Sequence, residues 1–256
     1  MKILHSKVRY GKLVTDIVYS DLRAKRAIIF GYGLLSSPRR HDDPIIRKFV
    51  QNGFVVFLPR YYGTYESDGV CTFENAVDSL LDAIKLVKKR CARDIRSNDV
   101  AKWNAEQIIL SGGSFGGAAA LVAGAKSRSV RKIISIAGPT DWRTQRGTSA
   151  YRLMWSIAYK NTWRCSKAAW KNLINGKLDL NAVDYAKVLR DKDVMFIHGS
   201  DDKIVSLRHS KILFEKLQGG KGNHKLIVIK DVGHHGILGF LTRPRIFKQA
   251  MRWMKS

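Results

Sequence analysis

Cysteine is scarce in this sequence of 256 residues, and its few copies are poorly placed for a disulfide framework or a metal site. Cys71, Cys91 and Cys165 are odd in number, lie far apart and show no Cys-x-x-Cys spacing. The first ten residues carry a charge every few positions and contain no apolar core of a signal peptide. We therefore expect the chain to stay in a reducing, cytoplasmic location.

Long hydrophobic runs are also missing. The uncharged stretch that comes nearest to membrane-spanning length covers residues 107–125. Its Ser-Gly-Gly-Ser and Gly-Gly centre is too polar and too weak in helix propensity for a membrane helix, whereas a strand, a turn and a helix account for every residue. We predict a soluble protein without a transmembrane segment.

Acidic residues are few. The sequence has 46 Lys and Arg but only 21 Asp and Glu, so its formal net charge is +25. Such a charge suits a nucleic acid, an anionic substrate, a membrane surface or a host with a basic proteome. The basic residues are scattered and accompany no RNA-recognition, zinc-finger or helix-turn-helix signature. A nucleic-acid partner is therefore not predicted.

Short apolar runs alternate with helical patterns along most of the chain. After a hairpin around Gly11, buried strands are expected at residues 26–33, 53–59, 106–112, 132–138, 193–199 and 224–230. Helices are expected from residues 44 and 72 onward, at 115–126, at 205–218 and up to about 255. This alternation indicates an α/β fold with a mostly parallel central sheet and helices on both faces. We expect one domain over residues 1–256, with a lid insertion at about residues 139–190, where the pattern becomes irregular.

A glycine-rich turn follows one of these strands. Residues 112–116 read Gly-Gly-Ser-Phe-Gly, which fits Gly-x-Ser-x-Gly between a strand and a helix, the context that this motif requires. The glycines permit a sharp turn that holds the hydroxyl of Ser114 out from the sheet. A tight glycine turn without a catalytic role, or a weak phosphate-binding loop, would have the same sequence pattern. Neither alternative predicts a downstream acid and histidine.

An acid and a histidine are nevertheless present after later strands. Asp201 and Asp202 follow the strand at 193–199, and His234 and His235 follow the strand at 224–230. The carboxyl ends of parallel strands meet at one edge of a sheet, so these groups can gather around Ser114. A serine hydroxyl needs an imidazole base, and the imidazole needs a carboxylate to orient it. The order Ser, Asp, His therefore predicts a nucleophilic serine.

The stretches "SGGSFGG", "AGPTDW", "HGSDDKIV" and "VGHHG" make the chain, from Ala27 to its end, resemble a known family. They resemble the catalytic domain of prolyl oligopeptidase-like (S9-type) α/β-hydrolases, and also the dienelactone hydrolases. The resemblance implies an α/β-hydrolase fold in which Ser114, Asp202 and His234 are catalytic, with Asp201 and His235 as neighbours. Two differences stand out. Dienelactone hydrolases carry a cysteine where this chain has Ser114, and the large peptidases carry a propeller domain for which this chain has no room.

The same resemblance implies an oxyanion hole. One donor is expected to be the backbone N–H of Phe115, the residue after the nucleophile. The stretch "FGYG" resembles the Tyr-Gly-Tyr-Gly of oligopeptidases, which implies Tyr32 as the second donor, through its hydroxyl or its backbone N–H. A tyrosine merely packed on the rim is the alternative.

The lid insertion is rich in aromatic and basic residues. We expect Trp142, Tyr151 and Trp155 to line the substrate pocket. Eight basic residues and no acidic one lie between Trp142 and Leu178. Aromatic rings around the pocket with a basic rim would suit an anionic acyl substrate. In the alternative, the aromatic rings form the lid's own core and the basic residues form its solvated face.

We therefore predict a serine hydrolase of carboxylic esters that works through an acyl-enzyme and needs neither a metal nor an organic cofactor. A small peptidase or amidase would use the same residues, so the substrate could be a small ester or a short peptide. A non-catalytic basic binding protein is the remaining alternative. The sequence does not predict the oligomeric state.

Overall fold

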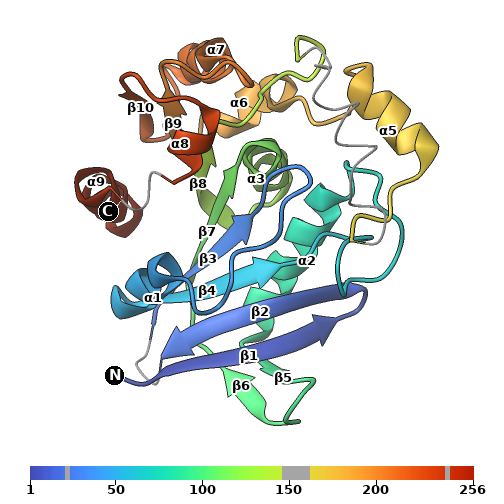
Figure 1. Cartoon of the computed structure of the whole chain (residues 1–256). Coiled ribbons are helices and arrows are strands. Elements are labelled where there is room, and N and C mark those ends of the chain that lie inside the picture. Colours follow the sequence, from blue (N-terminus) through green and yellow to red (C-terminus); the bar gives the residue numbers. More distant parts are fainter. Residues whose placement is uncertain (21–23, 146–161, 240–242) are drawn as a thin grey trace.

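The computed structural model describes residues 1–20, 24–145, 162–239 and 243–256 (Figure 1). Within them, eight strands form one sheet in the order β1-β2-β4-β3-β7-β8-β9-β10. The two N-terminal strands form an antiparallel hairpin, and β2 pairs antiparallel with β4. The other six strands run parallel to one another, as the α/β prediction requires. The strands are β1 (Ile3–Tyr10), β2 (Leu13–Ser20), β3 (Arg26–Gly31), β4 (Phe54–Pro59), β7 (Gln107–Gly113), β8 (Val130–Ile136), β9 (Asp193–Gly199) and β10 (His224–Ile229).

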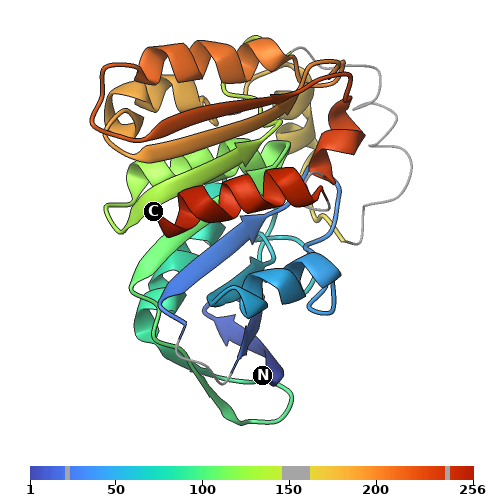
Figure 2. The same ribbon diagram turned by 90° about the vertical axis from the view of Figure 1, so that its left-hand side faces the viewer.

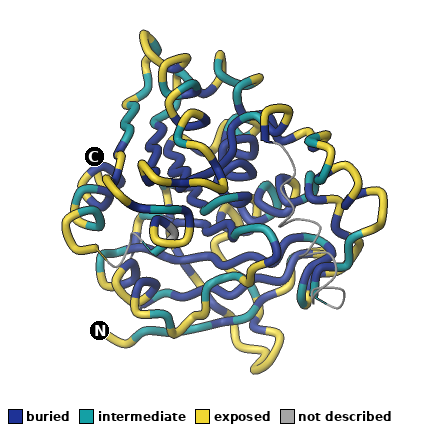
Figure 3. Tube along the Cα trace, turned by 45° about the horizontal axis from the view of Figure 1, so that its top comes forward, coloured by how far each residue is buried: buried dark blue, intermediate teal, exposed yellow. Residues whose placement is uncertain are grey.

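Helices cover both faces of this sheet, and each face has its own apolar core. On one face lie α2 (Ala76–Lys89), α3 (Phe115–Lys126) and α7 (Leu207–Leu217). On the other lie α1 (Pro44–Gln51), α8 (His234–Leu238) and α9 (Pro244–Lys255), and Figure 2 shows α1 and α9 side by side on it. Alternate residues of a strand serve opposite cores: Ile29 packs on the first face and Ile28 on the second. The predicted fold class is confirmed, and the buried residues gather around the sheet (Figure 3).

Two local features differ from the sequence expectation. The helix expected from residue 72 begins at Ala76, because Phe73 takes a left-handed φ of 68° that an α-helix does not allow. A second, two-stranded sheet is formed by β5 (Cys91–Arg93) and β6 (Val100–Lys102). Strands of three residues are too short to show the alternation from which a strand is predicted.

The irregular stretch after β8 contains short helices in its described part. These are α5 (Lys167–Ile174), η1 (Ala182–Tyr185) and α6 (Ala186–Leu189). Just before α5, residues 163 and 165 form isolated β-bridges to residues 64 and 71 of the loop after β4. This stretch is therefore attached to the domain by backbone pairing as well as by side-chain packing. Among the described residues, no helix has the length and apolar character needed to cross a membrane.

The turn between β7 and α3 leaves almost no space between three backbone segments. A Cβ at Gly112 would lie 2.1 Å from the carbonyl oxygen of Gly116. A Cβ at Gly116 would lie 2.6 Å from the carbonyl carbon of Gly31, at the end of β3. Only glycine fits at these positions, so α3 approaches β3 and β7 more closely than any side chain would permit.

We predict that Gly112→Ala severely destabilises the fold, because the new methyl group would meet backbone atoms that cannot move without opening the turn. The free energy of unfolding, measured by urea denaturation, should fall by at least about 3 kcal/mol. Gly239→Ala is the control, since its Cβ would meet nothing nearer than 3.7 Å, and it should change stability by less than about 1 kcal/mol. Equal stability of the two variants would contradict this account of the turn.

Candidate active site

Ser114 occupies a strained position at the junction of β7 and α3. Its backbone has φ 53° and ψ −124°, a left-handed conformation that a non-glycine residue adopts only at an energetic cost. The backbone N–H of Ser114 donates to the carbonyl of Ile136 on the neighbouring strand at 2.8 Å. This bond fixes the turn against β8, so the Ser114 side chain is held at the carboxyl edge of the sheet.

His234 lies between Ser114 and Asp202. Its Nε2 is 2.9 Å from Ser114 Oγ, and its Nδ1 is 2.7 Å from Asp202 Oδ2. An ionised carboxylate only accepts hydrogen bonds, so Nδ1 carries the proton and Nε2 is left to accept the proton of the serine hydroxyl. The structure thus brings together the three residues that the sequence analysis selected, from the ends of three parallel strands.

Asp202 is held by more than the histidine. Its Oδ1 accepts the backbone N–H groups of Ile204 at 3.0 Å and Val205 at 2.8 Å, and His198 Nε2 lies 3.4 Å from its Oδ2. Burial opposes ionisation of Asp202, but hydrogen bonds from His198, His234 and Val205 outweigh it and hold the pKa of this carboxyl well below its usual range. A carboxyl whose pKa is lowered by folding stabilises the fold above about pH 4, and this stabilisation is lost as the pH falls through the lowered pKa.

The neighbouring Asp201 and His235 could have served as the acid and the base, but both are exposed. Asp201 is exposed and pairs with Lys203 at 2.7 Å. His235 is exposed, and its ring lies edge-on to the ring of His234 with 5.9 Å between centroids. The structure therefore favours Asp202 over Asp201 and His234 over His235, as the sequence pattern does.

The loop after β3 passes directly beside Ser114. A Cβ at Gly33 would lie 3.6 Å from the Cβ of Ser114. On the other side, Phe115 begins α3, and the N–H groups in the first turn of a helix have no partner within the helix. Backbone N–H groups of Phe115 and of the residue 32 loop are thus placed where a negative oxygen could be bound next to Ser114.

The hydroxyl of Tyr32 is not available to bind such an oxygen, because it is already hydrogen-bonded within the protein. It accepts the backbone N–H of Tyr61 at 2.9 Å and lies 2.6 Å from the Thr64 hydroxyl. Thr64 gives its only proton to the carbonyl of Tyr61 at 2.7 Å, so the proton of Tyr32 must go to Thr64. The expectation that the Tyr32 hydroxyl donates to an oxyanion is therefore wrong. Only the backbone N–H of Tyr32 remains as a candidate donor.

The aromatic residues expected to line the substrate pocket have a different role where the structure describes them. Trp142 is 1% exposed, and its ring packs edge-on against Phe115 with 6.2 Å between centroids. Trp163 and Trp170 are buried in the same core. The expectation that Trp142 faces the substrate is wrong, because its ring fills the space behind the nucleophile turn. Tyr151 and Trp155 lie outside the described residues.

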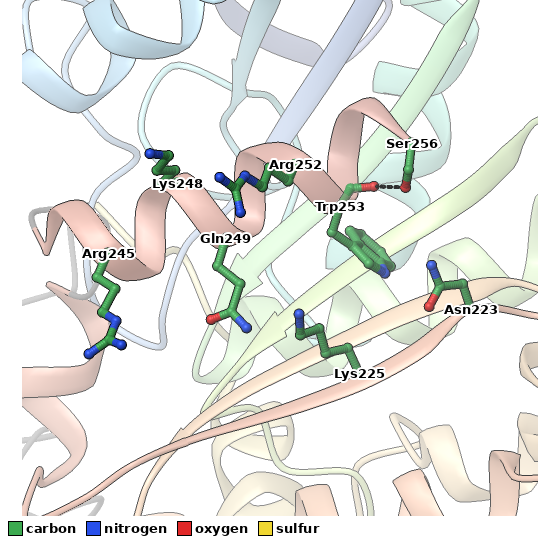
Figure 4. Close-up of a pocket in the computed structure, with 8 residues that line it drawn as sticks. All are labelled: Asn223, Lys225, Arg245, Lys248, Gln249, Arg252, Trp253 and Ser256. Carbon is green, nitrogen blue, oxygen red and sulfur yellow. Dashed lines mark hydrogen bonds between the residues drawn. The ribbon is translucent and has the colours of Figure 1, made fainter.

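A small cavity lies next to Gly113, the residue before Ser114, although Ser114 itself is not part of its lining. Its volume is about 200 Å³, and it is lined by Phe30, Gly31, Tyr32, Gly33, Ser36, Ser37, Arg39, Gly113 and Ile136. Most of these residues were not expected from the sequence, since a lining position in a loop leaves no periodic signal. A larger cavity of about 650 Å³ lies between α9 and β10, where its lining includes Lys225, Arg245, Lys248 and Arg252 (Figure 4). That cavity contains none of the three gathered residues.

Among the described residues, no group of three or more His, Cys, Asp or Glu side chains could hold a metal ion. Ser114, His234 and Asp202 place a hydroxyl, an imidazole and a carboxylate in a hydrogen-bonded row.

Comparison with known proteins identifies a family for the chain. The model of the prolyl oligopeptidase family matches residues 45–256. No curated protein sequence matches the chain significantly.

Several solved structures share the fold. An esterase of Pyrococcus furiosus has a TM-score of 0.70 and 15% identity, over 99% of this chain and 90% of that one. The α/β-hydrolase GrgF of Penicillium sp. sh18 has a TM-score of 0.69 and 18% identity, over 100% of this chain and 98% of that one. An acylaminoacyl peptidase of Pyrococcus horikoshii has a TM-score of 0.65 and 16% identity, over 98% of this chain but only 41% of that one. These likenesses confirm the α/β-hydrolase fold.

We predict that Tyr32→Phe lowers stability, because the buried N–H of Tyr61 would lose its acceptor and the Thr64 oxygen would lose the proton donated by Tyr32. Denaturant titration should show a loss of about 1–3 kcal/mol in the free energy of unfolding. Tyr19→Phe is the control, since its hydroxyl makes only a 3.3 Å contact with Ser6 in the β1–β2 hairpin, and it should cost under about 1 kcal/mol. Unchanged stability in Tyr32→Phe would mean that its hydroxyl is not held as described.

Proposed function

Because the chain belongs to the prolyl oligopeptidase family of α/β-hydrolases, we propose that it is a serine hydrolase that cleaves carboxylic esters through an acyl-enzyme. The observation that carries this proposal is the row of two hydrogen bonds from Ser114 through His234 to Asp202, at 2.9 and 2.7 Å. The conformation of Ser114 supports it as well, since a strained backbone at a polar residue is found most often at functional sites.

The reaction takes place in two halves. Ser114 Oγ attacks the ester carbonyl while His234 Nε2 takes the hydroxyl proton, and Asp202 stabilises the resulting imidazolium. Backbone N–H groups of Phe115 and Tyr32 hold the negative oxygen of the tetrahedral intermediate. His234 then gives its proton to the leaving alcohol. In the second half, His234 activates a water that attacks the acyl-enzyme, and Ser114 regains its proton as the acid leaves.

The size of the cavity next to Gly113 supports a short acyl group. At about 30 Å³ for each water-sized group, a space of about 200 Å³ holds roughly six carbon atoms. Its lining combines the apolar residues Phe30 and Ile136 with three glycines and with the polar residues Ser36, Ser37 and Arg39. We take this cavity as the acyl site, with residues 139–190 as a cap.

We choose an ester because a solved esterase matches this chain over 99% of its length with a TM-score of 0.70, although an acylaminoacyl peptidase also matches, over 98% with a TM-score of 0.65. A small peptidase or amidase remains the alternative, because the same three residues can cleave an amide. A panel of esters and anilides with the same acyl group distinguishes the two.

The basic residues of the cap give weaker support to an anionic substrate than their number suggests. Arg143 pairs with Asp141 at 2.7 Å and with Asp184 at 2.9 Å. Arg164 donates to the backbone carbonyls of Tyr65 and Ser67. Of the five basic cap residues that the structure describes, two are thus engaged within the protein. We therefore propose a neutral ester, and equal rates for a neutral ester and its carboxylate analogue at low salt would agree with this choice.

We predict that Ser114→Ala abolishes both ester turnover and labelling by a fluorophosphonate while leaving the fold intact. Loss of the nucleophile or the base of such a triad commonly costs a factor on the order of 10⁶ in kcat. His234→Ala should have a similar effect, because the hydroxyl then has no base.

His235→Ala is the matched control for the base. It removes an exposed imidazole from the adjacent position, so kcat should stay within about threefold of the original. If His235→Ala is the more damaging of the two, the base has been assigned to the wrong histidine. If Ser114→Ala keeps its turnover, the acyl-enzyme proposal fails.

We predict that kcat/KM for nitrophenyl esters rises with acyl length to about six carbons and then falls. Each added methylene that enters the cavity should raise kcat/KM about fourfold, from about 0.8 kcal/mol per buried CH₂. Ile136→Ala enlarges the cavity and should move the optimum to longer acyl chains. Ile134→Ala, on the same strand but not part of the lining, should leave the optimum unchanged. A flat profile up to twelve carbons would contradict the acyl-site assignment.

A further inference from the structure

Two cysteines that are far apart in the sequence lie side by side in the structure. Cys71 is in the loop after β4, and Cys165 comes two residues before α5. They are partners in an isolated parallel β-bridge, and the backbone N–H of Cys71 donates to the carbonyl of Arg164 at 2.9 Å. Neighbouring strands lie about 4.7–4.9 Å apart, and residues paired across them project their side chains to the same face. This separation lies within the Cα range of disulfides, about 4.4–6.8 Å.

The bridge is one of several contacts that hold the two segments together. The backbone N–H of Tyr65 donates to the carbonyl of Thr162 at 2.7 Å, and that of Arg164 donates to the carbonyl of Gly63 at 2.8 Å. Thr64 forms a second bridge, to Trp163. Residues 162–165 are therefore fixed along residues 63–71 by backbone bonds up to the cysteines themselves, so the fold holds the two thiols near each other.

The loop that carries Cys71 is itself tightly closed. Gly63 has φ 74°, and a Cβ there would lie 2.0 Å from the backbone nitrogen of Cys71. Only glycine permits this approach, so the position of Cys71 is set by the fold of its own loop. A cysteine held in this way can be cross-linked without a large movement of the backbone.

The thiols themselves are in contact and differ in access. Both are free, Cys71 is 1% exposed, and Cys165 is half-buried. A hydrogen bond with the Cys71 thiol, together with burial, raises the pKa of the Cys165 thiol. Thiolates rather than thiols exchange with disulfides, so the folded pair reacts slowly at neutral pH. This property suits a structural cross-link better than a fast redox sensor.

We propose that Cys71 and Cys165 are a modification site that forms one intramolecular disulfide, with a low-molecular-weight disulfide such as oxidised glutathione as the oxidant. The more accessible Cys165 loses its proton and attacks one sulfur of glutathione disulfide, which releases the first glutathione. Cys71 then loses its proton and attacks the Cys165 sulfur of the mixed disulfide, which releases the second glutathione. Two protein thiols are oxidised and one glutathione disulfide is reduced to two thiols, so atoms and electrons balance.

The cross-link would act on the segments that surround the nucleophile turn. Tyr61 and Thr64, in the loop it joins, hold the hydroxyl of Tyr32. Trp163, two residues before Cys165, packs on Tyr32 and Phe115 with ring centroids 5.7 and 6.2 Å apart. A bond that closes a loop of roughly 95 residues restricts the unfolded chain strongly, so the oxidised protein should melt about 10 °C higher than the reduced one.

The test incubates the whole chain with excess oxidised glutathione at pH 7 and pH 9, then counts free thiols and identifies cross-linked peptides by mass spectrometry. We expect a loss of the Cys71 and Cys165 thiols with a Cys71–Cys165 peptide, a faster reaction at pH 9, and a rise of about 10 °C in Tm. Cys91→Ser is the matched control, since Cys91 is exposed on β5, and it should behave as the original does. Cys165→Ser should show neither the cross-link nor the rise in Tm.

Three results would overturn the proposal. The pair could stay reduced while Cys91 is glutathionylated, the recovered peptides could join Cys91 to another cysteine, or both thiols could end as separate mixed disulfides. A cross-linked protein whose Tm does not rise would refute the stabilising role. None of these readouts depends on ester turnover, so the site is tested independently of the proposed function.

Discussion

The contact between glycine backbones at the end of β7 is the constraint on which the site depends. Gly112 and Gly116 bring the first turn of α3 against β7 and β3 at distances that exclude any Cβ. Ser114, between them, is left with a left-handed φ of 53°, and its N–H is tied to β8. The strain is offset by α3 itself, which buries its side chains on nearly all sides in the core between the sheet and α2. The position of the serine hydroxyl therefore depends on the packing of the whole helix α3.

The loop after β4 connects this turn to residues 162–165. Through Tyr61 and Thr64 it holds Tyr32, whose backbone passes beside the nucleophile, and through its own backbone it holds residues 162–165. Trp163 links these segments to the nucleophile turn, because its ring packs on both Tyr32 and Phe115. The position of the loop after β3 thus depends on the attachment of residues 162–165, and a change in one is expected to reach the other through direct contacts.

One cluster of positive charge lies away from Ser114. Arg39 is the charged residue that lines the cavity next to Gly113, and it pairs with Asp43 at 2.7 Å. In contrast, the cavity between α9 and β10 is lined by four Lys and Arg side chains and by no acidic residue (Figure 4). A net charge of +25 therefore describes the surface as a whole and says little about the preferred substrate.

The sequence by itself determined the architecture of the sheet and the identity of the three hydrogen-bonded residues Ser114, His234 and Asp202. Apolar runs with a period of two or 3.6 report which segments face a core, and the alternation of strands and helices implies a parallel sheet. Once the strands are parallel, Ser114, Asp202 and His234 must meet at one edge, so their meeting needed no knowledge of long-range contacts. Only the tertiary structure decided the direction of the Tyr32 hydroxyl, the burial of Trp142 and the pairing of Cys71 with Cys165. These depend on which side chain occupies a given space between segments far apart in the chain, and no local spacing or periodicity encodes that information.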